Sequence, residues 1–374
     1  MTMSDFPPGL VLIIGAFLLP IIGQRLRPML TLGLPLLTLY LVWSLPNGTF
    51  STLSLLDYNL AFIQSDSISR LFATVFSIMT FGGSLFALKQ KRVLELVSVF
   101  VYAGSAIGVV FAGDLISLFI FWEIMAVAST VVVLSAGGKR SYQISMRYFF
   151  VHVFGGTLLL IGILSHIVET GSTAFTAMEP NTFGTIFILM GFLINAAAPP
   201  LSAWLSDAYP EASFSGAVFL SAFTTKAAVY VLLRGFPGTE VLIFIGVFMI
   251  FYGIIYALLE NDMRRILAYS IVNQVGFMVT GVGIGTEMAL NGVAAHAFTH
   301  IIYKGLLLMS AGSVLYMTGR RKCTDLGGLF QSMPLTAFCS IIGALSISSF
   351  PLTSGFISKS MISQAAADES LTFV

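Results

Sequence analysis

Residues 114–130 read DLISLFIFWEIMAVAST, and Glu123 stands nine residues into this apolar run. A helix that crosses the hydrocarbon core requires about 20 apolar residues, so the run and its flanks predict a membrane-spanning helix. A charged side chain near the centre of such a helix costs about 2.5–3.5 kcal/mol on insertion scales. Glu123 is therefore a candidate functional residue.

The composition of the whole chain is that of a membrane protein. Of its 374 residues, 57% are hydrophobic and only 9% are charged, whereas soluble domains carry about 25% charged residues. So few charges cannot cover a surface that faces water, and the apolar runs are too continuous for barrel strands. We predict an all-α polytopic membrane protein with about 12–13 spanning segments in a lipid bilayer. The formal net charge of +1 indicates no nucleic-acid partner.

The apolar runs give the expected positions of these segments. They are 9–24, 29–45, 68–88, 93–113, 115–135, 143–168, 182–204, 212–234, 241–260, 264–283, 288–316, 335–350 and 353–370. Pro199 and Pro200 fall inside the seventh segment, and the last two are candidates for the halves of one interrupted helix. Proline kinks a helix, and interrupted helices near the membrane centre recur at transporter ion sites, often in inverted repeats.

The connecting loops alternate in charge along this topology. One set of loops is basic and contains Arg25, Arg27, Lys89, Lys91, Arg92, Lys139, Arg140, Arg147, Arg264, Arg265, Arg320, Arg321 and Lys322. The opposite set is acidic and contains Asp57, Asp66, Asp114, Glu169, Glu179, Glu240 and Glu287. The positive-inside rule then places the N-terminus outside and the basic loops in the cytoplasm. A loop with Asp207 and Glu211 falls on the cytoplasmic side although it is acidic.

A lysine occupies the middle of another predicted helix. Lys226 lies in residues 217–233, AVFLSAFTTKAAVYVLL. In a medium with little water, the ionisation of Lys226 and of Glu123 depends on their neighbours, so each can exchange a proton when a nearby charge changes. The alternative is a structural ion pair, which these two residues could form with one another.

Three titratable residues share one face of a later helix. His296, His300 and Lys304 lie four residues apart in residues 291–309, NGVAAHAFTHIIYKGLLLM, and residues at this spacing lie one above the other. Histidine titrates near neutral pH, so the face is a candidate proton wire. Packing and a metal site are the alternatives, but no carboxylate or cysteine joins the face, and we expect no metal.

Other polar residues have simpler explanations. Lys359, in residues 348–362, is a candidate proton carrier, or a lysine whose amine reaches the membrane surface. Asp114 suits the cap of a helix as well as a functional role, and His152 is a lone histidine on an apolar helix, where packing is the commoner role. Cys323 and Cys339 are too few for a disulfide framework. Phosphate-binding and nucleophile-elbow motifs are absent, so we expect no cofactor and no enzymatic site.

Six motifs in order resemble a known family. They are GDLISLFIFWE at 113–123, WLSDAYPEAS at 204–213, AFTTKAAVY at 222–230, NDMRRILAYSIVNQVGFM at 261–278, AAHAFTHIIYKGLL at 294–307 and FPLTSGFISKSM at 350–361. Together they resemble the antiporter-like subunits shared by respiratory complex I and the Mrp-type multisubunit Na+/H+ antiporters, with the wording most similar to the D-type subunit of the Mrp antiporters. The resemblance covers roughly residues 95 to 365, most of the chain.

No long linker or low-complexity tract divides the sequence, so we expect a single transmembrane domain over residues 1–374, and the resemblance implies its internal arrangement. N-terminal helices would occupy 1–92, and two inverted five-helix repeats, each with an interrupted helix, would occupy 93–260 and 264–374, the second incomplete. It also implies a chain of charged residues near the membrane centre that translocates protons. By position in the motifs, this proton path contains Glu123, Lys226, Arg264, His296, His300, Lys304 and Lys359.

The sequence departs from the family pattern at two places. Arg264 stands where many relatives have a bridging lysine, and an arginine keeps its charge, so it cannot itself pass a proton. Ser206 replaces the usual proline of its motif, and the sequence from Pro200 to Ser202 replaces a segment in which relatives often have a histidine.

Three functions follow from the resemblance. The first is a proton-translocating subunit of a multisubunit Na+/H+ antiporter, not an enzyme, which acts with other hydrophobic subunits in the cell membrane of a prokaryote. The second is a proton-pumping membrane subunit of a complex I-like NADH:quinone oxidoreductase or membrane-bound hydrogenase, without its own redox centre. The third is a structural subunit of such an assembly that conducts nothing.

Overall fold

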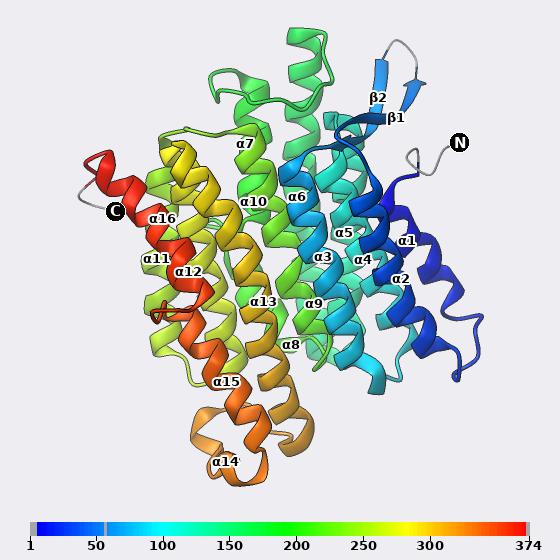
Figure 1. The fold of residues 1–374 in the computed structure, drawn as a ribbon, viewed down its shortest axis with the longest axis vertical. Coiled ribbons are helices and arrows are strands. Elements are labelled where there is room, and N and C mark those ends of the chain that lie inside the picture. Colours follow the sequence, from blue (N-terminus) through cyan, green and yellow to red (C-terminus); the bar gives the residue numbers. More distant parts are fainter. Residues whose placement is uncertain (1–5, 56–57, 372–374) are drawn as a thin grey trace. The chain divides into compact units, whose positions relative to one another are not determined.

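The computed structural model describes residues 6–55 and 58–371, which form two compact units. The first unit is Met1–Asn195 and the second is Ala196–Val374. Asp57, which belongs to the acidic loops, lies outside the described residues. Helices dominate both units (Figure 1).

The first unit contains seven α-helices, a short 3-10 helix and a β-hairpin among its described residues. Its elements are α1 (Pro8–Leu18), α2 (Arg27–Ser44), β1 (Gly48–Leu55), β2 (Tyr58–Ser65), α3 (Ser67–Phe86), η2 (Ala87–Lys89), α4 (Val93–Phe111), α5 (Leu115–Leu134), α6 (Lys139–Thr170) and α7 (Phe183–Asn195). The two strands are antiparallel, with Gly48 opposite Ser65. This hairpin was not predicted, because its mixed polar and apolar residues were interpreted as a loop between helices.

Aspartates fix the beginnings of two helices of the first unit. Asp66 caps α3 by accepting a hydrogen bond from the Ser69 amide. At the start of α5, Oδ1 of Asp114 accepts from the amides of Ile116 and Ser117, at 2.9 and 2.8 Å. Its Oδ2 accepts from the amide of Ala61 in β2, at 2.8 Å. Asp114 is therefore a helix cap that also joins α5 to the hairpin.

The second unit continues with helices of very different lengths. Its elements are α8 (Ala203–Glu211), α9 (Gly216–Ala222), α10 (Thr224–Gly235), α11 (Val241–Leu259), α12 (Met263–Ile284), α13 (Glu287–Thr318), η3 (Cys323–Asp325), α14 (Leu329–Ser332), α15 (Pro334–Ile347) and α16 (Ser354–Asp368). Helix α12 packs against both α11 and α13, and α16 packs against α13.

The helices have the length and composition of membrane spans. Eight helical segments of the described chain are long and apolar enough to cross a bilayer, and three shorter apolar helices accompany them. The eight begin at Ser67, Val93, Leu115, Lys139, Gly216, Val241, Met263 and Glu287. The prediction of an all-α polytopic membrane protein is confirmed, with the β-hairpin as an addition.

The interruptions lie close to the predicted places. Helix α7 ends at Asn195, before the two prolines, so the predicted segment 182–204 is one shorter helix followed by the non-helical residues 196–202 and the first two residues of α8. Helices α15 and α16 are separated by residues 348–353, and Figure 1 shows the short connection between them. A third interruption, at Phe223 between α9 and α10, was not predicted, because no proline or glycine marks it.

Helix lengths recur in the same order. Helices α4, α5 and α6 have 19, 20 and 32 residues, and α11, α12 and α13 have 19, 22 and 32. Helix α7, with 13 residues, follows α6, and α15, with 14 residues, follows α13 after the short η3 and α14; each precedes an interruption. These lengths align α11 with α4, whereas the expected boundaries 93–260 and 264–374 put α11 in the first repeat. The repeat boundaries stay a prediction.

Candidate functional site

Glu123 faces a groove on the first unit. The groove has a volume of about 430 Å³ and is lined by residues of α4 and α5, namely Leu94, Val97, Ser98, Val101, Glu123, Ile124, Val127, Ala128 and Val131. Glu123 is half-buried, and its Oε1 accepts no hydrogen bond from the described residues. A carboxylate in such apolar surroundings depends on a proton or an approaching cation for its stability.

A glycine of α6 makes room for this carboxylate. A Cβ at Gly156 would lie 2.8 Å from the Cδ of Glu123 and closer still to its Oε1. The glycine therefore lets the α6 backbone approach the carboxylate. The sequence does not reveal this contact, because a glycine in an apolar helix is typical of close helix packing in general.

Lys226 is completely buried at an interruption of the second unit. Its Nζ donates hydrogen bonds to the carbonyl oxygen of Ser221, at 2.7 Å, and to Oγ1 of Thr225, at 3.1 Å. The helix is interrupted at Phe223, and the Lys226 amine is hydrogen-bonded to the Ser221 carbonyl, which precedes this interruption. Glu123 and Lys226 belong to different units, so their pairing stays a prediction.

The three titratable residues of α13 are buried together. His296, His300 and Lys304 have no exposed surface, and the two imidazole rings stack with their centroids 6.0 Å apart. Neither ring nitrogen of His300 has a hydrogen-bond partner among the described residues. Lys304 donates through Nζ to the hydroxyl of Ser270 in α12. The predicted face therefore exists as one buried column.

Two neighbouring helices hold the first histidine of this column. Nδ1 of His296 lies 2.9 Å from Oγ of Ser358 in α16, and its Nε2 lies 3.1 Å from Oε1 of Gln274 in α12. The same Oε1 accepts a hydrogen bond of 3.2 Å from Oη of Tyr303. Gln274 thus joins two α13 side chains, and sequence reasoning missed it because a neutral amide in a helix carries no signal of its own.

Lys359 lies one residue beyond Ser358 and is half-buried. Its Nζ donates a hydrogen bond of 2.8 Å to the carbonyl oxygen of Ile347, the last residue of α15. Like Lys226, Lys359 donates a hydrogen bond from its amine to a backbone carbonyl beside an interruption. Carbonyls at helix ends lack their intrahelical donors, so a lysine is a suitable partner there.

Arg264 has a different environment. Its guanidinium donates hydrogen bonds of 2.8–3.4 Å to four backbone carbonyl oxygens around the end of α8. They belong to Tyr209, Pro210, Ala212 and Ser213. The side chain therefore closes the C-terminal end of α8 and joins it to α12. These four acceptors stabilise the buried positive charge, so the contacts of Arg264 need no proton transfer to explain them.

Ion pairs surround Arg264 at the same end of the unit. Arg265 lies 3.1 Å from Asp207 and 3.2 Å from Glu260, measured from guanidinium nitrogen to carboxylate oxygen. Arg321 lies 3.0 Å from Glu211 and 2.8 Å from Asp262. Asp207 and Glu211 were the acidic exception in the predicted topology. The presence of these two acids in a loop on the basic side is explained, because both pair with arginines of the basic segments.

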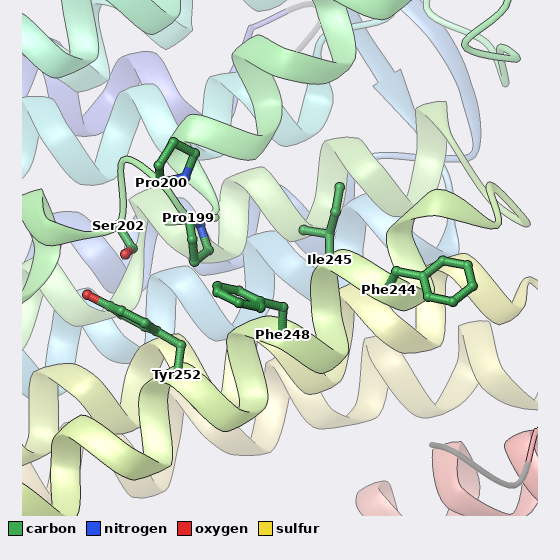
Figure 2. A pocket seen from close by; sticks show the side chains of 7 residues that line it. All are labelled: Pro199, Pro200, Ser202, Phe244, Ile245, Phe248 and Tyr252. Carbon is green, nitrogen blue, oxygen red and sulfur yellow. The ribbon is translucent and has the colours of Figure 1, made fainter.

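A pocket of about 600 Å³ lies beside the segment that follows α7. Pro199, Pro200 and Ser202 line one side of it, and α11 supplies the other side through Phe244, Ile245, Phe248 and Tyr252 (Figure 2). In Figure 2 the ring of Phe248 faces Pro199 and the Tyr252 hydroxyl points toward Ser202. None of the seven predicted path residues lines this pocket.

Residues 112–374 match the protein family described as NADH:quinone oxidoreductase/Mrp antiporter, transmembrane. The chain belongs to this family. The predicted resemblance is therefore confirmed, and all seven path residues lie in the matched region.

Named relatives come from both branches of the family. The chain is 32% identical over 280 residues to the D subunit of the Na(+)/H(+) antiporter of Alkalihalophilus pseudofirmus, covering 69% of this chain and 56% of the relative. It is 32% identical over 274 residues to the N subunit of the NADH-quinone oxidoreductase of Desulforudis audaxviator, covering 68% of this chain and 54% of the relative. The chain thus spans about half the length of these family members.

A solved structure shows the same fold. A chain in the Mrp complex from Dietzia sp. DQ12-45-1b superimposes with a TM-score of 0.86 at 23% identity, covering all of this chain and 76% of that one. The two chains therefore share the overall fold.

Proposed function

We propose that the chain is the proton-translocating subunit of a multisubunit monovalent cation/proton antiporter, with Na+ as the exchanged cation. The observation that carries the proposal is the buried column of His296, His300 and Lys304, tied to α12 through Gln274 and Ser270. Titratable residues inside a membrane protein are costly and mark ion or proton pathways. The similarity to the D subunit of a Na(+)/H(+) antiporter supports the exchange of a cation.

In this proposal the proton path runs from Glu123 and Lys226 through the α13 column to Lys359. Each lysine holds a carbonyl oxygen at an interruption when it is protonated. Loss of the proton weakens that hydrogen bond, because the charge that strengthened it is gone. The lysine can then turn toward another partner, so proton transfer and side-chain movement are coupled. The membrane potential supplies about 2.3 kcal/mol per charge per 100 mV.

Arg264, the remaining path residue, has a positioning role in the proposal. A guanidinium does not lose its proton in proteins, and its donors are directed at the end of α8. It fixes the helix that follows the first interruption, and its positive charge acts on neighbouring groups without carrying the proton.

We further propose that the subunit is a multi-pass protein of a prokaryotic cytoplasmic membrane, with its N-terminus outside. The basic loops and the arginine cluster of Arg264, Arg265 and Arg321 would then face the cytoplasm, as the positive-inside rule requires. Other hydrophobic subunits are the proposed partners. The subunit is a part of a secondary transporter and not an enzyme.

The test is cation-driven proton movement in everted membrane vesicles that contain the complete assembly. Addition of Na+ should move protons out of vesicles with the wild-type subunit, and this movement should be lost with Lys226→Ala and with Glu123→Gln. Co-purification of the other subunits controls for assembly. Wild-type exchange in both variants at normal assembly would show that neither residue lies on the path.

A second candidate is a proton pump driven by redox chemistry. The similarity to the N subunit of an NADH-quinone oxidoreductase favours it. The partners that co-purify decide between the two, since flavin or iron–sulfur subunits indicate the redox-driven assembly and small hydrophobic subunits alone indicate the antiporter. A third candidate, a subunit that conducts nothing, predicts normal activity after neutral replacement of Lys226 and Lys304, singly and together.

A further inference from the structure

Helices α6 and α13 carry polar residues at equal positions. Both have 32 residues. His300 lies thirteen residues after Glu287, the first residue of α13, and His152 lies thirteen residues after Lys139, the first residue of α6. His296 and Tyr148 correspond in the same way, nine residues from the start of their helices. The pair Tyr148–His152 therefore stands in the first set of helices where His296–His300 stands in the second.

The pair in α6 is buried and hydrogen-bonded. Tyr148 and His152 are at most 1% exposed, and their ring centroids are 4.2 Å apart. Oη of Tyr148 donates to Oγ of Ser129 in α5, at 3.0 Å. Nδ1 of His152 lies 2.8 Å from Oδ1 of Asn195, the last residue of α7.

Together, the two hydrogen bonds of the α6 pair resemble the two that His296 makes alone, whereas neither ring nitrogen of His300, which aligns with His152, has a partner among the described residues. In each case one hydrogen bond goes to the preceding helix, through Ser129 in α5 or Gln274 in α12. The other hydrogen bond goes to a residue near an interruption. That residue is Asn195, just before the interruption after α7, or Ser358, in the helix after the interruption between α15 and α16. A lone packing histidine does not explain the matching positions of the two pairs in their helices.

The α6 pair also lies close to Glu123 along the helix. The carboxylate of Glu123 lies against Gly156, which is one turn of α6 beyond His152. Ser129, the partner of Tyr148, is on the same helix as Glu123. One end of the cluster is therefore near the carboxylate, and the other end is at Asn195, where α7 stops.

We propose that Tyr148 and His152 form a second proton relay, the counterpart of His296 and His300, which connects Glu123 with the interruption after α7. The proposal rests on the proposed transport function. The amide oxygen of Asn195 accepts from Nδ1–H of His152 and so fixes the tautomer of the ring. Nε2 is then the nitrogen that binds a proton and later releases it, while the Nδ1–H bond to Asn195 stays intact. Tyr148 orients the ring from the opposite side.

The test compares His152→Asn with His152→Ala in vesicles that hold the complete assembly. The introduced amide keeps a donor at the place of Nδ1, and so keeps the bond to Asn195, but it does not titrate. We expect His152→Asn to be present in wild-type amount while Na+-driven proton movement falls at least about tenfold. A purely structural histidine predicts the contrary, with near-wild-type movement in His152→Asn and a defect only in His152→Ala, and that result overturns the relay.

Two further outcomes are decisive. If His152→Asn does not accumulate, Tyr148→Phe takes its place, because this change removes one hydroxyl and keeps the ring pair. Reduced movement in Tyr148→Phe at normal assembly supports the relay, and wild-type movement overturns it. If the wild-type assembly itself shows no Na+-driven proton movement, the proposed function fails and the relay fails with it. Wild-type exchange that His152→Asn leaves unchanged refutes the relay alone.

Discussion

The carboxylate of Glu123 lies against the backbone of Gly156, so that a Cβ on this glycine would stand 2.8 Å from its Cδ. The carboxylate is the far end of a flexible side chain and can move away at low cost. A methyl group at Gly156 therefore displaces the carboxylate toward the groove between α4 and α5 without disturbing the helix contacts.

This relationship gives a prediction with an adjacent control. Gly156→Ala should lower cation-driven proton movement at least about tenfold with unchanged amounts of the subunit in the membrane. Gly155→Ala should leave transport close to wild type, because its Cβ would meet Ile194 of α7 at 3.0 Å and not Glu123. Equal transport in both variants would mean that the position of the carboxylate does not matter.

Lys226 offers a test of proton transfer against simple charge. Lys226→Arg keeps a positive donor beside the interruption at Phe223, but a guanidinium does not release its proton. We expect the variant to assemble and to lose most proton movement, measured in the same vesicles. Substantial transport with arginine at this position would assign Lys226 an electrostatic role.

Gln274 is expected to matter more than Tyr303, although the two residues share a hydrogen bond. Gln274→Leu removes the acceptor for both His296 and Tyr303, and leaves the ring nitrogen of the histidine without that partner. Tyr303→Phe removes only one donor. Transport should therefore fall several-fold further in Gln274→Leu than in Tyr303→Phe, and the reverse order would exclude Gln274 from positioning the histidine.

Arg264 should prove important for stability. Arg264→Met removes the guanidinium donor from the carbonyl oxygens of Tyr209, Ala212 and Ser213, and leaves that of Pro210 with only the longer bond from Arg321. Each buried bond to a charged group contributes about 1.5–3 kcal/mol, so we expect the variant to lose thermal stability in detergent. Arg265→Met, which breaks two partly exposed ion pairs, should cost roughly 1 kcal/mol or less. Equal melting temperatures for the two variants would contradict the role assigned to Arg264.

Much of this architecture was predictable from where charges and prolines fall in apolar runs. Spacing alone placed His296, His300 and Lys304 on one face, and Pro199 and Pro200 marked the first interruption. The break at Phe223 escaped prediction because the residues around it have no conformational restriction that a sequence reveals.

The contacts of the site were harder to predict than its titratable residues. Gln274 acts through a neutral amide, and Gly156 matters because the absence of a side chain leaves room for the Glu123 carboxylate. Neither residue has a sequence pattern of its own. Asp207 and Glu211 pair with Arg265 and Arg321, which lie more than fifty residues away along the chain, and only the tertiary structure brings them together. The acidity of this segment is an exception to the positive-inside pattern that only the tertiary structure explains.

The arginine cluster at the end of α8 also sets an order of events during biosynthesis. Arg321, which pairs with Glu211 and donates to the carbonyl of Pro210, lies 111 residues beyond that proline. When α8 leaves the ribosome, neither Arg264 nor Arg321 has been synthesised. Asp207 can therefore pair with Arg265 only after the start of α12 has been synthesised, and Glu211 can pair with Arg321 only after the chain beyond α13 has been synthesised.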